Sequence, residues 1–361
     1  DLESSASRIL PVCTSCGELA MEVQFLGCLS LRATGANANL FGGISGAYLH
    51  GSRLFLVSDT TRLTKAPWWG AGRFFVADLL TEPAFDLTGS SVLLPGLVRP
   101  AGLQHVYTQT LQDRFAHDLD TDKYHGDTES LVVKWPDQAF IGVEMTHLLR
   151  HYAGLSLDRP ADQIVMGTPT VEGLRSPHAK HFHDLGAKLR GCQHAGGNEG
   201  AEGVTLLKGD RLLVLCEHNR PGSPDDQTIG WMANSDTAEI QASFTVQLPS
   251  VPGHPGVFYR ISGLTQLPGT ADLMILFHHW SVGTGNMVKV GRVHLDLHTH
   301  SSEADPIHLN PAMVFALTEE DGYPLDSFET LVVEEVPGRR GAYMLHLLSD
   351  NNFNTGAQKT L

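Results

Sequence analysis

The chain has 361 residues, a formal net charge of −15 and only 18% charged residues. This net charge argues against sequence-independent binding to nucleic acid or to an anionic membrane, which requires a basic face. Its apolar runs are far shorter than the roughly 20 residues of a membrane-spanning helix. With 37 glycines and 19 prolines, the composition favours many short strands joined by tight turns over long helices.

Residues 1–20 are expected to form an N-terminal extension, and residues 21–361 a single domain. The extension holds Cys13 and Cys16, spaced as C-x-x-C. Because no second pair of this kind follows, a local disulfide or two free thiols fit the spacing better than a closed zinc site. Residues 21–31 alternate in part between apolar and polar side chains, which predicts one strand or two.

Five stretches then repeat one pattern. A polar residue opens an apolar run, a turn rich in Gly, Asp or Pro follows, and a second apolar run closes on another polar residue. Two such runs predict a β-hairpin. The opening residues lie 60 to 84 residues apart, and each lies 14 to 21 residues before its closing residue. The opening and closing residues are Ser45 and Asp59, Glu129 and Glu144, Glu202 and Glu217, Ser262 and His278, and Glu329 and Asp350.

The segments between the hairpins are less regular. Residues 60–125 either supply the outer strands of the first sheet or hide a degenerate extra hairpin. Residues 151–198 form a long insertion, in which the histidines of 176–184 fit a polar surface loop better than a metal site. Cys216 alternates with apolar neighbours, which predicts a core position. A strict alternation over 293–300 predicts a solvated outer strand with one polar face, made by His294, Asp296, His298 and His300.

Radial repetition of the hairpins predicts an all-β fold, a β-propeller of five or six four-stranded blades. In an antiparallel pair, the first residue of one strand lies beside the last residue of its partner. Every hairpin would therefore turn its polar end toward one rim of a central channel. The strand predicted over 21–31 would close the ring against the C-terminal blade. Ser45 and Ser262, which stand where other copies carry Glu, would cap the hairpin end or accept a hydrogen bond.

Seven carboxylates would meet at this rim. Like charges a few ångströms apart repel one another or raise one another's pKa. A bound hard cation removes this repulsion, and Ca²⁺ takes about 6–8 oxygen ligands. We therefore expect a calcium site, and its predicted ligands are Asp59, Glu129, Glu144, Glu202, Glu217, Glu329 and Asp350.

The chain resembles a known family at several of these positions. The segments are 41–46 (Phe-Gly-Gly-Ile-Ser-Gly), 127–130 (Asp-Thr-Glu-Ser), 197–203 (Gly-Asn-Glu-Gly-Ala-Glu-Gly), 349–353 (Ser-Asp-Asn-Asn-Phe) and 358–361 (Gln-Lys-Thr-Leu). Together they resemble the phytase-like family described as having "esterase-like activity of phytase". The resemblance implies a β-propeller, export from the cytoplasm and hydrolysis of phosphoric esters. It also implies that the seven carboxylates occupy the acidic positions of the family.

Two positions depart from the family pattern. The fourth hairpin ends in His278-His279, where the resemblance leads us to expect Glu-Arg. The segment after Glu144 reads Met-Thr-His, without the expected Arg. Both departures remove groups that suit phosphate binding.

A hydrolase would use the hairpin ends directly. The calcium ion would polarise a phosphoryl oxygen and activate water, and Glu129 or Glu202 would take the proton. His147, Arg220 and Lys359 are the expected contacts to a small phosphoester. A serine hydrolase is not indicated, because residues 43–47 lack the second glycine and the strand-to-helix turn of a nucleophile elbow.

The alternative is a non-catalytic propeller that binds another protein surface as a scaffold. Propellers serve as interaction platforms as readily as they serve as enzymes. An enzyme would lose activity on chelation of its metal, and a scaffold would present an apolar or repeated outer surface.

Overall fold

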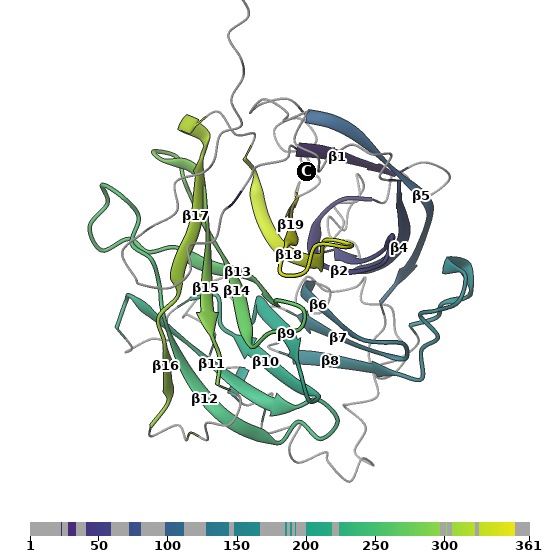
Figure 1. Cartoon of the computed structure of the whole chain (residues 1–361), viewed down its shortest axis with the longest axis horizontal. Helices are drawn as coiled ribbons and strands as arrows, with labels where there is room; N and C mark the ends of the chain where they lie inside the picture. Colours follow the sequence, from purple (N-terminus) through teal and green to yellow (C-terminus); the bar gives the residue numbers. More distant parts are fainter. Residues whose placement is uncertain are drawn as a thin grey trace, which may run out of the picture.

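The computed structural model describes residues 23, 28–33, 41–58, 72–80, 98–111, 128–143, 148–166, 185, 188, 189, 192, 200–218, 224–296, 301, 305–321 and 325–350. These residues form nineteen strands and two short 3-10 helices, η2 (Ala161–Gln163) and η4 (Glu319–Asp321). The strands make five sheets that follow one another around a common centre (Figure 1). The all-β class predicted from composition is confirmed.

Each sheet contains one of the predicted hairpins. The strand orders across the five sheets are β1-β5-β4-β3-β2, β6-β7-β8, β16-β12-β11-β10-β9, β13-β14-β15-β17 and β18-β19. The first sheet holds β1 (Cys28–Ala33), β2 (Ile44–His50), β3 (Arg53–Ser58), β4 (Arg73–Leu80) and β5 (Val98–Thr110). The second holds β6 (Thr128–Lys134), β7 (Gln138–Val143) and β8 (Leu148–Ala153). The third holds β9 (Gly203–Leu207), β10 (Arg211–Leu215), β11 (Gln227–Asn234), β12 (Ile240–Gln247) and β16 (Ile307–Leu309). The fourth holds β13 (Arg260–Gln266), β14 (Asp272–Ser281), β15 (Gly285–His294) and β17 (Ala312–Thr318), and the fifth β18 (Ser327–Glu335) and β19 (Tyr343–Asp350).

The first hairpin strand of each sheet lies innermost, and we call β2, β6, β9, β13 and β18 the inner strands. They contact one another in a closed order, β2 with β6, β6 with β9, β9 with β13, β13 with β18 and β18 with β2. Sheets that meet through such a ring of inner strands form a β-propeller. The propeller predicted from the repeated hairpins is therefore confirmed.

Five clusters of buried apolar side chains fill the spaces between consecutive sheets. Each cluster takes members from two neighbouring sheets, and the last joins the fifth sheet to the first. Because burial of a large apolar side chain stabilises a fold by about 1.5–3 kcal/mol, these clusters hold the ring together. Representative members from the two sheets are Phe55 with Leu131, Phe140 with Val214, Leu215 with Ile275, Leu276 with Leu331, and Val332 with Leu56.

The inner strands share one irregularity near their start. In four of them the register shifts by one residue, and the residue left out of the pairing is Ser45, Glu129, Ser262 or Glu329. In the third sheet, Ala201 and Glu202 stand opposite the single residue Cys216, because Gly203 pairs with Leu215 while the Glu217 amide donates to the Gly200 carbonyl. Each opening residue predicted from the repeat thus lies in a β-bulge, a device that re-aims a side chain at a sheet edge.

Small residues beside the bulges let the inner strands approach. A Cβ atom built on Gly46 would lie 2.5 Å from the backbone nitrogen of Leu131 on the next inner strand. A Cβ atom on Gly263 would lie 3.2 Å from the backbone nitrogen of Leu331. The glycine after the bulge is therefore part of the ring geometry.

The closure predicted for residues 21–31 is not confirmed. Residues Cys28–Ala33 form β1, which pairs in parallel with β5 at the outer edge of the first sheet. Of the rest of this segment the structure describes only Val23, which packs against the cluster that contains Phe328 and Leu331. The described parts of the first and fifth sheets meet through apolar packing and through the contact of β18 with β2.

The region between the first two hairpins supplies outer strands, as one of the two alternatives predicted. Its described residues form β4 and β5 of the first sheet. The strand predicted over 293–300 ends earlier than expected, since β15 ends at His294 and residues 297–300 lie outside the described part. The boundary predicted between residues 20 and 21 lies outside it as well.

Candidate mouth of the propeller

The bulges gather at one end of the ring, which we call the mouth. There, consecutive sheets are joined by short polar contacts. Ser45 Oγ donates a hydrogen bond to the carbonyl oxygen of Thr128, and Ser262 Oγ donates to that of Phe328 at 2.9 Å. Thr128 and Phe328 each precede a bulged glutamate. The two serines therefore act as donors between neighbouring sheets, whereas the sequence led us to expect caps or acceptors.

Two further contacts extend this series. The Ala47 amide donates to Thr330 Oγ1 at 3.2 Å, which ties the first sheet to the fifth. The Ile261 amide donates to the Glu217 carbonyl at 3.1 Å, which ties the fourth sheet to the third. The backbone at the mouth is thus fixed from sheet to sheet, so side chains placed on the bulges start from a rigid frame.

The predicted carboxylates within the described residues occupy two kinds of position. Glu129, Glu202 and Glu329 lie on bulges and are partly exposed. Glu217 and Asp350 close their hairpins and are buried, at 7% and 1% exposure. The backbone brings Glu202 close to Glu217 and Glu329 close to Asp350, since Ser327 pairs with Asp350 and the Ser327 hydroxyl donates to Glu329 Oε1 at 3.0 Å.

These carboxylates fit a hard cation in kind, because carboxylate oxygens are the ligands that Ca²⁺ takes. Within the part of the chain that the structure describes, however, His, Cys, Asp and Glu side chains nowhere form a group of three able to hold a metal ion. Two predicted ligands, Asp59 and Glu144, lie outside that part. The convergence of all seven carboxylates remains a prediction.

The expected substrate contacts cannot be placed in the same way. His147, Arg220 and Lys359 lie outside the described residues, as do Cys13, Cys16 and the histidine-rich segment 176–184. Their predicted roles therefore rest on the sequence and on the family resemblance.

The fourth hairpin differs chemically from the others. It places no carboxylate at its open end, and Arg260 pairs there with His278. Arg260 Nη1 lies 3.1 Å from Glu217 Oε1 of the third sheet, with the Arg260 side chain 48% exposed and that of Glu217 9% exposed. The guanidinium therefore neutralises one of the predicted metal ligands, a contact that the sequence pattern did not reveal.

His278 is a neutral group in this setting. Burial lowers its pKa from 6.5 to about 4, the hydrogen bond to Asn286 opposes this shift, and the positive charges of His279 and Arg260 add to it. Its Nε2 atom lies 3.0 Å from Asn286 Oδ1. An imidazole with so low a pKa keeps one nitrogen as a donor and the other as an acceptor near neutral pH.

His279 points to the other face of β14, where it meets Tyr259 at 6.0 Å between ring centroids. Lys289 Nζ lies 4.4 Å from the centroid of the Tyr259 ring and donates to the Ser250 carbonyl at 3.3 Å. Burial raises the pKa of Tyr259 to about 12 and lowers that of Lys289. Tyr259 thus remains a neutral phenol between two nitrogen groups.

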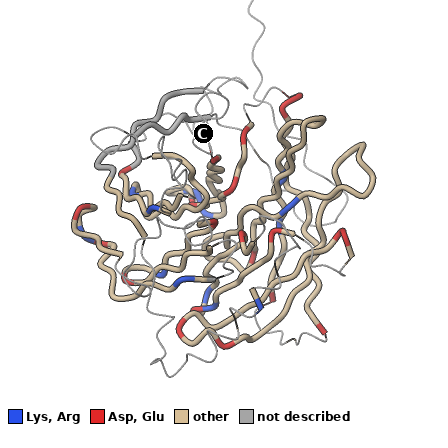
Figure 2. The backbone as a smooth tube through the Cα atoms, turned by 180° about the vertical axis from the view of Figure 1, so that it is seen from behind, with Lys and Arg blue, Asp and Glu red and all other residues tan. Residues whose placement is uncertain are grey.

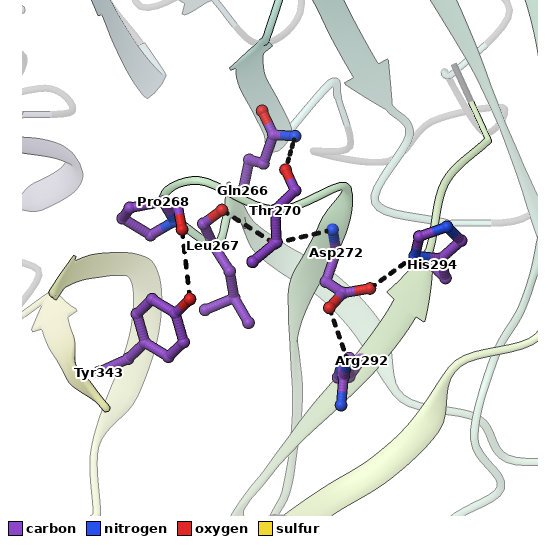
Figure 3. A network of polar contacts seen from close by, with 8 residues as sticks. All are labelled: Gln266, Leu267, Pro268, Thr270, Asp272, Arg292, His294 and Tyr343. Atoms are coloured by element: carbon purple, nitrogen blue, oxygen red, sulfur yellow. Dashed lines mark hydrogen bonds and ion pairs between the residues drawn. The ribbon is translucent and has the colours of Figure 1, made fainter. Parts of the chain in front are cut away.

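The opposite end of the same strands carries a different polar group. Figure 3 shows Asp272 at the start of β14, with Arg292 and His294 of β15 beside it. Asp272 Oδ2 lies 2.6 Å from Arg292 Nη2, and Asp272 Oδ1 lies 2.9 Å from His294 Nδ1. This carboxylate uses both oxygens to hold two strand residues, which is a structural role at the end away from the mouth.

Two buried groups were missed by sequence reasoning. Cys192 and Cys216 form a disulfide; the core position predicted for Cys216 is correct, but five cysteines do not define a pairing. Arg150 on β8 is 2% exposed and lies opposite Ile141, a member of the cluster between the first and second sheets. No pattern in the sequence marks it as buried.

Charge is distributed rather than concentrated. In Figure 2, Asp and Glu residues lie in turns and strand ends of several sheets, and Lys and Arg residues lie among them. No helix in the described part of the chain is both long and apolar enough to cross a membrane.

Matches among solved structures have low sequence identity to this chain. An α-L-arabinofuranosidase from Clostridium thermocellum has 7% identity and a TM-score of 0.45, with 88% of this chain and 84% of that chain covered. An endo-arabinanase from Bacillus licheniformis has 11% identity and a TM-score of 0.40, with 92% and 95% covered. An endo-arabinase from Bacteroides thetaiotaomicron has 9% identity and a TM-score of 0.43, with 89% and 93% covered.

No curated protein matches the chain. A family model does, over residues 39–353, and its description is "Esterase-like activity of phytase". The match contains all five hairpins, the bulged residues and the disulfide. The chain therefore belongs to the phytase-like family.

Proposed function

We propose that this protein is an exported, calcium-dependent hydrolase of phosphoric esters whose reaction takes place at the mouth. The observation that carries the proposal is the family match over residues 39–353, combined with bulged glutamates on β6 and β18 and with Glu202 directly before β9. A bulge turns a side chain out of the regular pleat, and a partly exposed carboxylate on a rigid frame suits a general base.

In this proposal Glu129 or Glu202 accepts the proton of the attacking water. Both are partly exposed, whereas Glu217 is buried and paired with Arg260 and Asp350 is 1% exposed. The exposed bulge positions are therefore the better candidates for contact with solvent and substrate. His147, Arg220 and Lys359 are proposed to contact the phosphoester.

The proposed calcium ion would be held by Asp59, Glu129, Glu144, Glu202, Glu217, Glu329 and Asp350 or by a subset of them. Because the described residues alone form no three-ligand group, we propose that Asp59 or Glu144 completes the site. When bound, the ion would polarise a phosphoryl oxygen and lower the pKa of a coordinated water.

Export is supported by the disulfide between Cys192 and Cys216. Structural disulfides persist in oxidising compartments and are rare in the cytosol of most organisms. We also propose that each of the five sheets is one blade, since each contributes one inner strand to the ring.

Release of inorganic phosphate tests the hydrolase directly. The purified protein is incubated with a simple aryl phosphate and with a polyphosphorylated cyclitol, in calcium and after treatment with a chelator. We expect calcium-dependent release from at least one substrate. Equal rates with and without calcium would rule out the calcium requirement. Phosphate release no faster than the uncatalysed rate would rule out the hydrolase activity.

A second candidate function is a binding protein, and one observation favours it. Trp280 and Val282, near the tip of the β14–β15 hairpin, are 60% and 94% exposed. Exposed apolar side chains at a protruding tip suit contact with another protein. The binding-protein hypothesis replaces the hydrolase if the unchanged protein releases no phosphate and captures a partner protein that Trp280→Ser no longer captures.

A further inference from the structure

A charged side chain lies buried between the first and second sheets. Arg150, on β8, is 2% exposed and pairs with Ile141 on β7. Paired residues of antiparallel strands project their side chains to the same face of the sheet, and Ile141 belongs to the apolar cluster that fills the space between these two sheets. The next residue, His151, stacks on Phe140, which faces the third sheet. The alternation along β8 therefore directs the Arg150 side chain toward the first sheet.

A second polar side chain enters the same space from the first sheet. Gln109, on β5, pairs with Phe74 on β4, and Phe74 belongs to the same cluster as Ile141. The Gln109 side chain is therefore directed toward the second sheet. Its Oε1 atom accepts a hydrogen bond from the Met166 amide at 3.3 Å, so the amide group of Gln109 is held by its oxygen.

The register of the strands places the two side chains at the same level of the ring. In the first sheet, one row of paired residues crosses β2, β3, β4 and β5, and its members are Gly46, Val57, Phe74 and Gln109. In the second sheet, a row crosses β6, β7 and β8, and its members are Leu131, Ile141 and Arg150. The rows meet at the inner strands, where a Cβ atom on Gly46 would lie 2.5 Å from Leu131 N (Figure 1). Gln109 and Arg150 thus stand at the outer ends of two facing rows.

Both side chains carry buried donors. Within the part of the chain that the structure describes, Arg150 Nε, Arg150 Nη1 and Gln109 Nε2 are buried and have no hydrogen-bond partner. All three are N–H groups, which donate and cannot accept. Buried polar groups in folded proteins are almost always paired, and a buried charge without a counter-charge is especially unfavourable. Because a guanidinium stays charged, the partner that suits this site is an acceptor with negative charge.

The surroundings select the kind of anion. Arg150 supplies one positive charge to a space that otherwise holds the apolar side chains of the cluster. A monovalent anion balances that charge, whereas a dianion would bring a second charge out of water without compensation. A close-packed interior also favours a small ion over a large one. These conditions describe a halide better than an oxyanion of higher charge.

We propose that Arg150 and Gln109 form a buried binding site for a small monovalent anion of the halide type, such as chloride. The ion accepts hydrogen bonds from the guanidinium of the second sheet and from the amide nitrogen of the first. It thereby links β8 to β5, outside the contact of the inner strands β2 and β6. The site is separate from the proposed hydrolase, since neither residue lies on an inner strand.

The test is the melting temperature of the 361-residue chain as chloride replaces gluconate at constant ionic strength. Gluconate is monovalent but bulky, so charge screening stays equal while the halide concentration changes. For a site half filled near about 10 mM, we expect the melting temperature to rise by about 2–3 °C between about 1 mM and about 300 mM chloride.

Two variants locate this effect. Arg150→Met removes the charge and keeps a long apolar side chain, so its melting temperature should not depend on chloride. Gln109→Glu keeps the acceptor for the Met166 amide and adds a carboxylate that takes the place of the ion, so its chloride response should also vanish. The matched control is Gln266→Glu, because Gln266 Oε1 likewise accepts a backbone amide, that of Lys208 at 3.0 Å. This control should keep the chloride response of the unchanged protein.

A melting temperature of the unchanged protein that does not depend on chloride would overturn the proposal. An equal chloride response in all variants would also overturn it, because the salt would then act on the protein as a whole. If Arg150→Met does not fold, the comparison of Gln109→Glu with Gln266→Glu decides. Equal chloride responses in these two variants would contradict the site.

Discussion

Replacement of Gly46 by alanine should weaken the ring of inner strands. Gly46 follows the bulge at Ser45, and a Cβ atom there would lie 2.5 Å from Leu131 N, 2.7 Å from Ser130 C and 2.8 Å from Val57 Cγ2. Two of these atoms are backbone atoms of β6, so the neighbour cannot yield by rotating a side chain. Either β2 and β6 move apart or the bulge is distorted.

The magnitude follows from two opposing effects. Overpacking in a close-packed interior costs about 1–3 kcal/mol, and contact with backbone favours the upper part of that range. Replacing glycine by alanine also stabilises by about 0.4–1 kcal/mol, because it restricts the unfolded chain. The net expected loss in the free energy of unfolding is about 2 kcal/mol.

Urea unfolding followed by circular dichroism measures this loss. The control is Gly283→Ala in the turn between β14 and β15, where a Cβ atom meets nothing within 4 Å and φ is not positive. The control should keep or slightly raise the midpoint. If Gly46→Ala unfolds at the same urea concentration as Gly283→Ala, the close approach of β2 and β6 is wrong.

Three further predictions concern pH, the disulfide and the metal. Stability should fall as pH drops from 6.5 toward about 4, since burial holds the pKa of His278 and His151 at about 4 in the folded chain. Below pH 6.5 the unfolded chain binds protons that the folded chain does not, and this lowers the free energy of unfolding by up to about 3 kcal/mol per imidazole. In His278→Gln, the urea midpoint should therefore depend less on pH. Removing the disulfide, which spans 24 residues, in the variant Cys192→Ala/Cys216→Ala should cost about 3 kcal/mol; an unchanged melting temperature would contradict it. Chelation should lower the melting temperature, and added calcium should restore it. An unchanged melting temperature would contradict the proposed calcium site.

The hairpins could be predicted because their signals are local. The apolar runs Leu54–Leu56 and Leu212–Leu215 each follow a turn, so strand and turn are both indicated within a few residues. The even recurrence of such units predicts radial repetition. The fold class and the opening residues followed from these two observations.

The bulges were less accessible to sequence reasoning. Ser45 and Ser262 stand where other copies carry Glu, which marks the position but not its geometry. Their hydroxyl groups donate to Thr128 and Phe328 on the next inner strand. A hydrogen bond between two sheets depends on the relative position of two hairpins that are distant in sequence. No local sequence pattern predicts that position.

Contacts distant in sequence also explain what local patterns left open. Glu217 pairs with Arg260 across 43 residues of sequence, and Cys192 bonds to Cys216 from a segment without a regular pattern. The segment 21–31 has the alternation of a strand, but alternation does not name a partner, and residues 28–33 join β5. Local patterns thus predicted the strands, whereas the partners of these residues depend on contacts between segments distant in sequence.

The central claim is that the glutamates on the bulges carry out hydrolysis of phosphoric esters. It is tested most directly by the rate of phosphate release in Glu129→Gln and Glu202→Gln, with Glu239→Gln, outside the inner strands, as control. The account predicts a loss of about 10²-fold or more in kcat for the variant that removes the base, with the control unchanged. Full activity in both bulge variants would contradict it.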